Sequence, residues 1–80
     1  MNMYFGNLNY RVKESDLERA LATYGTVNSV KIIKDRETGK SKGFGFVEMD
    51  DEVAAQVIKE LNGSDLMGRQ LVIKEALPKA

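Results

Sequence analysis

Aromatic and basic residues alternate in the octapeptide KGFGFVEM, residues 42–49. Successive side chains of a β-strand point to opposite faces, so Lys42, Phe44 and Phe46 would share one face. The Val and Met of the octapeptide would point to the other face, together with its two glycines. A small domain cannot bury both faces of one strand, so one face should be open. Flat rings beside a cation can stack on unpaired nucleic-acid bases and attract phosphates.

An alternative is that these rings belong to the core and that the strand lies in the other register. A shift by one residue would bury Phe44 and Phe46 but expose Val47 and Met49. It would also turn both glycines outward, where they contribute nothing. We therefore predict that the two rings lie on the open face. Phe5, in contrast, is expected in the core.

Composition places limits on the chemistry. The 80 residues suit one small domain, residues 1–80, and 42% of them are hydrophobic. The sequence has no cysteine and no histidine, which removes thiol chemistry and the commonest general base and metal ligand. No cofactor or metal is therefore expected. No apolar run approaches the ~20 residues of a membrane span, and the first residues do not resemble a signal peptide. The expectation is a cytoplasmic monomer without a membrane partner.

Charge is balanced overall but unevenly distributed. Twelve basic and twelve acidic side chains give a formal net charge of +0, which argues against indiscriminate binding to polyanions. Basic residues nevertheless dominate positions 31–42, and acidic residues dominate positions 50–60. These segments can be two ordinary solvated surfaces. The rings beside the basic segment favour a binding face instead.

Hydrophobic periodicity predicts four strands and two helices. Strands are expected at residues 3–6, 27–33, 43–49 and 70–75, and an exposed loop at 35–41. Helical spacing links two sets of apolar residues: Leu17, Ala20, Leu21 and Tyr24, and Ala54, Val57, Ile58 and Leu61. The first helix would begin with a capping box at Ser15 and Glu18, or one or two residues earlier, and stop at Gly25. The order βαββαβ indicates a ferredoxin-like α+β fold, in which a four-stranded antiparallel sheet carries both helices on one face.

The octapeptide resembles the longer signature of the RNA-recognition motif, which has a basic residue, Gly, an aromatic, Gly or Ala, an aromatic and Val in this order. Residues 3–8, MYFGNL, are similar to the family's shorter signature, with Tyr4 at its aromatic position. The resemblance runs from Asn2 to about Pro78 and is strongest to compact single-domain bacterial forms. Met49 departs from the Phe or Tyr usual there, at a position expected in the core.

The resemblance implies that single-stranded RNA binds on the open sheet face, with two or three bases stacked on aromatic rings. The candidate RNA-binding residues are Tyr4, Phe44, Phe46, Lys42, Lys31, Lys74 and Asn7. Lys31 and Lys74 can equally be solvated lysines, and Asn7 can be a turn residue. Three loop cations are further candidates for phosphate contacts: Arg36, Lys40 and Arg69.

Other functions remain open from the sequence. The same open aromatic face could dock a protein partner, and stacking alone does not separate RNA from single-stranded DNA. An enzyme is disfavoured, because the sequence shows no nucleophile–base pair and no carboxylates that can be placed in a cleft.

Overall fold

The computed structural model describes residues 1–76. Its elements follow the predicted βαββαβ order, with two additional short strands before the last one. They are β1 (Asn2–Gly6), α1 (Glu14–Leu21), β2 (Val27–Lys34), β3 (Ser41–Met49), α2 (Asp51–Leu61), β4 (Asp65–Leu66), β5 (Arg69–Gln70) and β6 (Val72–Ala76).

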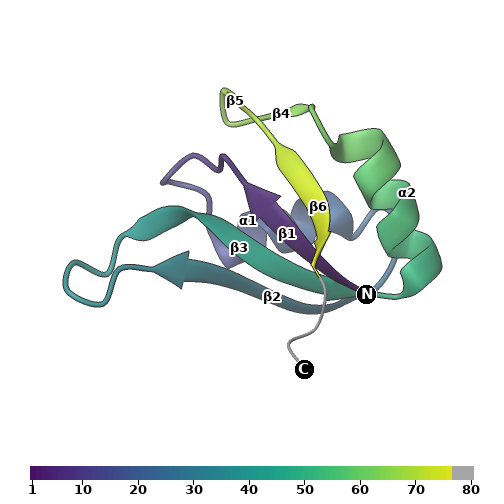
Figure 1. Ribbon diagram of the computed structural model, residues 1–80, viewed down its shortest axis with the longest axis horizontal. Helices are drawn as coiled ribbons and strands as arrows, with labels where there is room; N and C mark the ends of the chain where they lie inside the picture. The colour runs from purple at the N-terminus through teal and green to yellow at the C-terminus, as the bar shows by residue number, and fades with distance from the viewer. Residues whose placement is uncertain (77–80) are drawn as a thin grey trace.

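Four strands form one antiparallel sheet in the order β2-β3-β1-β6. The two signature strands, β1 and β3, are therefore its central strands. Figure 1 looks onto the open face of this sheet, with α1 behind it, α2 beside β6 and the β2–β3 loop projecting to one side. The predicted ferredoxin-like arrangement is confirmed. Neither helix of residues 1–76 has the length and apolar content needed to cross a membrane.

The core lies between the sheet and the helices. Phe5 and Met3 of β1 and Val47 and Met49 of β3 are at most 1% exposed, so the predicted register of both central strands is correct. Helix α1 contributes Leu17 and Leu21, and α2 contributes Ala54 and Val57. Met49 is fully buried, which confirms that the departure from the family pattern concerns packing.

Helix α1 is shorter than its apolar spacing predicts. It begins at Glu14, which agrees with the earlier start that the sequence left open. The Asp16 carboxylate accepts the backbone N–H of Lys13 at 2.9 Å, so the capping box lies here and not at Ser15. The helix ends at Leu21, and residues 22–24 form a turn. Ala20, predicted on the buried face, is exposed. An alanine adds too little apolar area to fix which way a helix faces.

The β4–β5 hairpin was not predicted from the sequence. Its turn places Met67 and Gly68 at φ values of 50° and 82°, which reverses the chain within two residues. The strand expected at 70–75 is thus divided, with β5 ending at Gln70 and β6 beginning at Val72. The residue types at 70–75 did not reveal this interruption, because Leu71, which separates the two strands, is apolar as in a continuous strand. In the structure Leu71 is buried.

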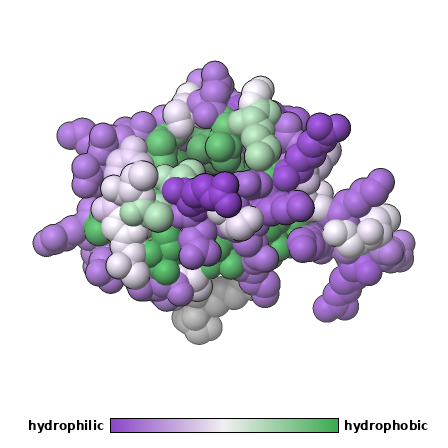
Figure 2. All heavy atoms as spheres, turned by 180° about the vertical axis from the view of Figure 1, so that it is seen from behind, coloured by the Kyte–Doolittle hydropathy of each residue, from purple (hydrophilic) through white to green (hydrophobic). Residues whose placement is uncertain are grey.

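The side opposite the open face is shown in Figure 2. Hydrophobic surface appears there between hydrophilic residues, and the projecting loop is mostly hydrophilic. The half-buried apolar residues Val53, Ile58 and Leu61 of α2 pack against the core from this side. The exposed aromatic rings of the signature strands lie on the other side of the sheet.

Candidate nucleic-acid interface

Three aromatic rings meet on the open face of the two central strands. The ring centroids of Tyr4 and Phe44 are 6.0 Å apart, those of Tyr4 and Phe46 are 5.9 Å apart, and those of Phe44 and Phe46 are 6.4 Å apart. Phe46 is 39% exposed, and the other two rings are half-buried by their neighbours. The predicted face is confirmed. Their edge-to-face and tilted contacts hold the rings in place while leaving parts of them accessible to a ligand.

Four candidate residues form one row across all four strands. Phe46 pairs with Lys31 on one side and with Tyr4 on the other, and Tyr4 pairs in turn with Lys74. The order across the sheet is thus cation, ring, ring, cation. Both lysines are exposed. Directly opposite residues of adjacent strands lie close enough for their side chains to interact, so each ring has a cation next to it.

Gly6 makes room for the Tyr4 ring. A Cβ atom at Gly6 would lie 2.7 Å from both Cε1 and the hydroxyl oxygen of Tyr4, which is closer than such contacts occur. The ring therefore lies along its own strand, over the glycine two residues further on. The missing side chain at Gly6 allows this orientation, which brings Tyr4 to Phe44 and Phe46.

Gly45 allows two backbones to approach. A Cβ atom at Gly45 would lie 2.5 Å from the carbonyl oxygen of Lys31 and 3.1 Å from Cα of Ile32. The neighbour of Gly45 is the edge strand β2, and the role of Gly45 is to keep Lys31 beside Phe46.

A local irregularity sets the position of Lys42. The pairing of β2 with β3 shifts register between Ile32 and Lys34, and Gly43 has a φ of 85°. Strict alternation is therefore interrupted at the start of β3. Lys42 is nevertheless exposed and lines a small hollow of about 240 Å³ together with Tyr4 and Phe44. Lys42 thus borders the ring cluster, as predicted.

Asn7 acts as a bridge to the β4–β5 hairpin. Its side-chain amide donates to the carbonyl oxygen of Gln70 at 2.6 Å, and its Oδ1 accepts from the Arg69 guanidinium at 2.8 Å. Its φ of 56° is typical of a turn asparagine. Both polar atoms of Asn7 are thus engaged within the protein, which supports the turn interpretation. Arg69 is held at the rim of the same hollow.

Tyr10 is an exposed aromatic residue at the edge of the ring cluster that sequence reasoning missed. It is 68% exposed, the largest exposure among the large hydrophobic residues described, and it lines the hollow with Tyr4 and Phe44. Its Cε1 atom lies 3.3 Å from the position of a Cβ at Gly43. Tyr10 belongs to the β1–α1 loop, where strand alternation does not apply. The only signal was an aromatic residue in a polar turn.

The β2–β3 loop presents cations around one ordered carboxylate. Asp35 accepts the backbone N–H groups of Glu37 and Thr38 at 2.8 and 3.2 Å. These two hydrogen bonds, with a smaller contribution from the Lys42 charge, lower the pKa of the Asp35 carboxyl below its ordinary value. Arg36 and Lys40 are exposed on this loop. The arrangement suits a ligand that carries negative charge and planar groups.

Comparison with known families identifies this arrangement. The family model described as the RNA recognition motif matches residues 3–72. The chain belongs to the RNA recognition motif family. The two signatures of this RNA recognition motif are the strands that carry the ring cluster.

Individual proteins agree with the family assignment. The Nostoc sp. protein RbpD is 46% identical over 80 residues, which covers 99% of this RNA recognition motif chain and 85% of the relative. The crystal structure of RNA Binding Protein PG1 is 54% identical and has a TM-score of 0.95, covering 100% of this chain and 98% of the other. The structure of the Rna15 RRM with bound RNA (GU) is 32% identical with a TM-score of 0.83, covering 94% and 81%.

Proposed function

We propose that this RNA recognition motif binds single-stranded RNA on the open face of its sheet. The observation that carries the proposal is the row Lys31, Phe46, Tyr4 and Lys74 across the four strands. A base has two flat faces that can stack on a ring, and its phosphate needs a nearby cation. The row provides both at the spacing of neighbouring strands.

Each candidate residue has a distinct role in this proposal. Tyr4, Phe44 and Phe46 stack on bases, and Lys31 and Lys74 contact phosphates at the two ends of the row. Lys42 contacts a phosphate or a base edge beside the ring cluster. Asn7 acts indirectly, because its polar atoms hold the β4–β5 hairpin against the interface. The proposal assigns binding and no catalysis to this face.

Single-stranded DNA is a second ligand class that the rings favour. Stacking and phosphate contacts do not involve the 2′-hydroxyl, which is the group that separates RNA from DNA. We expect the domain to bind both as a monomer. Titration with RNA and DNA of one sequence, side by side, measures the preference between them.

Substitution of the rings tests the proposal. Phe44→Ala or Phe46→Ala should each lower RNA affinity by roughly 5- to 150-fold, because a lost base–aromatic stack costs about 1–3 kcal/mol. The melting temperature should change little, since both side chains lie outside the core. Leu21→Ala is the matched control for folding. Leu21 is fully buried, and its truncation should cost about 2–5 kcal/mol of stability.

Two outcomes would contradict this account. Ring variants that melt as early as Leu21→Ala would show that the rings support the core. Ring variants that melt normally and bind RNA like the wild type would remove the sheet face as the RNA site. The second outcome would favour a protein partner on the same aromatic surface.

A further inference from the structure

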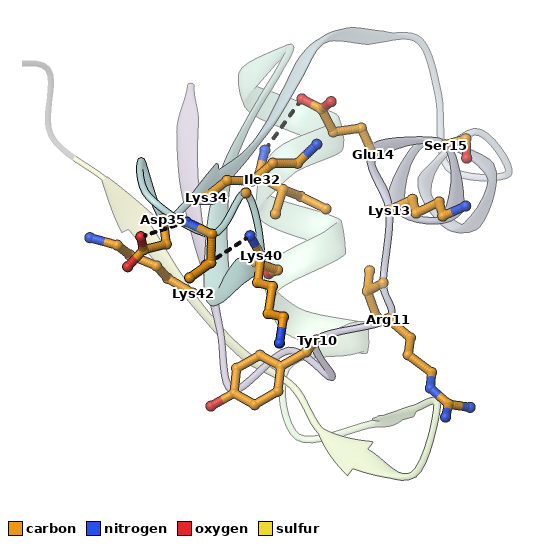
Figure 3. Close-up of a pocket in the computed structure, with 14 residues that line it drawn as sticks. Tyr10, Arg11, Lys13, Glu14, Ser15, Ile32, Lys34, Asp35, Lys40 and Lys42 are labelled. Atoms are coloured by element: carbon orange, nitrogen blue, oxygen red, sulfur yellow. Dashed lines mark hydrogen bonds between the residues drawn. The ribbon is translucent and has the colours of Figure 1, made fainter.

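A groove lies beyond the ring cluster, between the β1–α1 loop (residues 7–13) and the β2–β3 loop (residues 35–40). Its cavity volume is about 1080 Å³, larger than the hollow of the ring cluster. Figure 3 shows Lys40 extending from one loop toward Tyr10 on the other, while the Arg11 side chain extends away from the Tyr10 ring. The floor includes the buried side chains of Val12 and Ile32. None of the ring-cluster stacking residues lines this groove.

Cations outnumber available anions in this groove. Its lining includes five basic side chains: Arg11, Lys13, Lys34, Lys40 and Lys42. The two carboxylates of the lining already accept backbone N–H groups. Glu14 accepts the N–H of Ile32 at 3.3 Å, and Asp35 accepts two N–H groups within its loop. All five basic side chains are exposed. The groove is therefore a net cationic channel with an apolar floor.

The groove is continuous with the ring cluster. Tyr10 and Lys42 line both the groove and the hollow that contains Tyr4 and Phe44. The exposed Tyr10 ring packs beside Gly43. Because glycine has no Cβ atom, there is space for the ring at this position. An RNA strand that leaves the sheet face at the hollow therefore meets the exposed Tyr10 ring first and the basic side chains of the groove next. A ring followed by cations is the same arrangement that the sheet face presents.

We propose that an RNA strand longer than the sheet face continues over Tyr10 into this groove. Tyr10 stacks on the first base beyond the sheet, and Lys13 and Lys40 contact the phosphates that follow. The proposal rests on the RNA-binding function of the sheet and deepens it. The occupant is a single strand, because the site combines an exposed ring for a base with cations for a backbone. An acidic peptide would use the cations but would leave the Tyr10 ring without a planar partner.

The experiment compares RNA of two lengths. Randomised pools of 4 and 10 nucleotides are titrated with the wild type, with Tyr10→Ala and Tyr10→Phe, and with the double variant Lys13→Gln/Lys40→Gln. Longer RNA offers more binding registers, but this statistical gain is the same for every variant. Only a loss of contacts beyond the sheet face lowers the ratio of the 10-mer affinity to the 4-mer affinity. Lys59→Gln, on the exposed side of α2, is the control for charge removal.

Tyr10→Ala should weaken binding of the 10-mer by at least about fivefold, as expected for one lost stack, and change binding of the 4-mer by less than about twofold. Tyr10→Phe should bind like the wild type, because it retains the ring. The double lysine variant should make the slope of log K against log salt shallower by about 1.4 for the 10-mer, since each contacted phosphate contributes about 0.7. Lys59→Gln should leave both slopes unchanged.

Unchanged 10-mer affinity in both Tyr10→Ala and the double lysine variant would overturn the proposal. Equal losses on the two lengths would do so as well, because they would place Tyr10 within the sheet site. Phe46→Ala separates this failure from failure of the proposed function. If Phe46→Ala weakens the 4-mer while the groove variants have no effect, only the groove is excluded. If Phe46→Ala leaves the 4-mer unaffected, the sheet site itself is wrong.

Discussion

Gly6→Ala offers a way to move a stacking ring without removing it. The new Cβ would lie 2.7 Å from two atoms of the Tyr4 ring, whereas ordinary contacts begin near 3.4 Å. The ring must therefore move by at least about 0.7 Å. The nearest atoms belong to the far end of a side chain, so the backbone can stay in place. Tyr4 would lose its position relative to Phe44 and Phe46.

The expected effect is lower RNA affinity with unchanged or slightly higher stability. A partly displaced ring should lose about 1 kcal/mol, the low end of a base–aromatic stack, which corresponds to about fivefold in affinity. Replacing a strand glycine with alanine restricts the unfolded chain and stabilises by about 0.4–1 kcal/mol where the backbone allows it. The backbone at Gly6 allows alanine, because Gly6 is not among the glycines with positive φ.

Fluorescence titration with RNA and thermal melting are the assays, arranged as a double-mutant cycle with Tyr4→Ala. Tyr4→Ala alone should lose the full stack, about 1–3 kcal/mol of binding. In that background Gly6→Ala should have no further effect on RNA affinity, because the ring on which it acts is gone. A similar loss in both backgrounds would refute the reasoning and assign Gly6 a direct contact with RNA. A melting temperature of Gly6→Ala clearly below that of the wild type would also refute the reasoning.

Two further predictions follow from other contacts. Gly45→Ala should destabilise by about 1–3 kcal/mol and lower the melting temperature by about 4 °C or more, because its Cβ would meet the backbone of Lys31 and force the strands apart; an unchanged melt would contradict this. The Asp35 carboxyl, whose pKa is lowered in the folded state, should stabilise the loop above its ordinary pKa of about 3.9 and lose this contribution as pH falls through the lower folded value. An NMR titration of the Asp35 carboxyl and of the Glu37 and Thr38 amides checks this, and a midpoint at or above the ordinary value would be inconsistent with it.

The parts of the fold that depend on strict periodicity were predictable from the sequence. Alternation along residues 42–49 placed Phe44 and Phe46 outside and Met49 inside, because burial of one face fixes the register of a strand. The same argument located Lys31 and Lys74, since both face outward beside the rings. Their contact with RNA stays a prediction.

The parts that depend on turns and local contacts were not predictable. Helix α1 ends three residues before Tyr24, because the apolar spacing continues into a turn that still packs on the core. The β4–β5 hairpin depends on two consecutive positive φ values, one of them at Met67. Tyr10 was missed because a loop has no period from which the direction of a side chain can be read. The close approach at Gly45 appears only when the neighbouring strand is in place.

The register shifts of β2 have a consequence for self-association. β2 is an edge strand, and its pairing with β3 is irregular between Val27 and Ser29 and again between Ile32 and Lys34. An exposed edge with regular hydrogen-bonding groups is a template on which another chain can add a strand and begin to aggregate. Irregularities and lysines on an edge disrupt that template. Copies of this domain can therefore keep their aromatic faces free for a ligand, because the irregular edge strand β2 resists joining them into a continuous sheet.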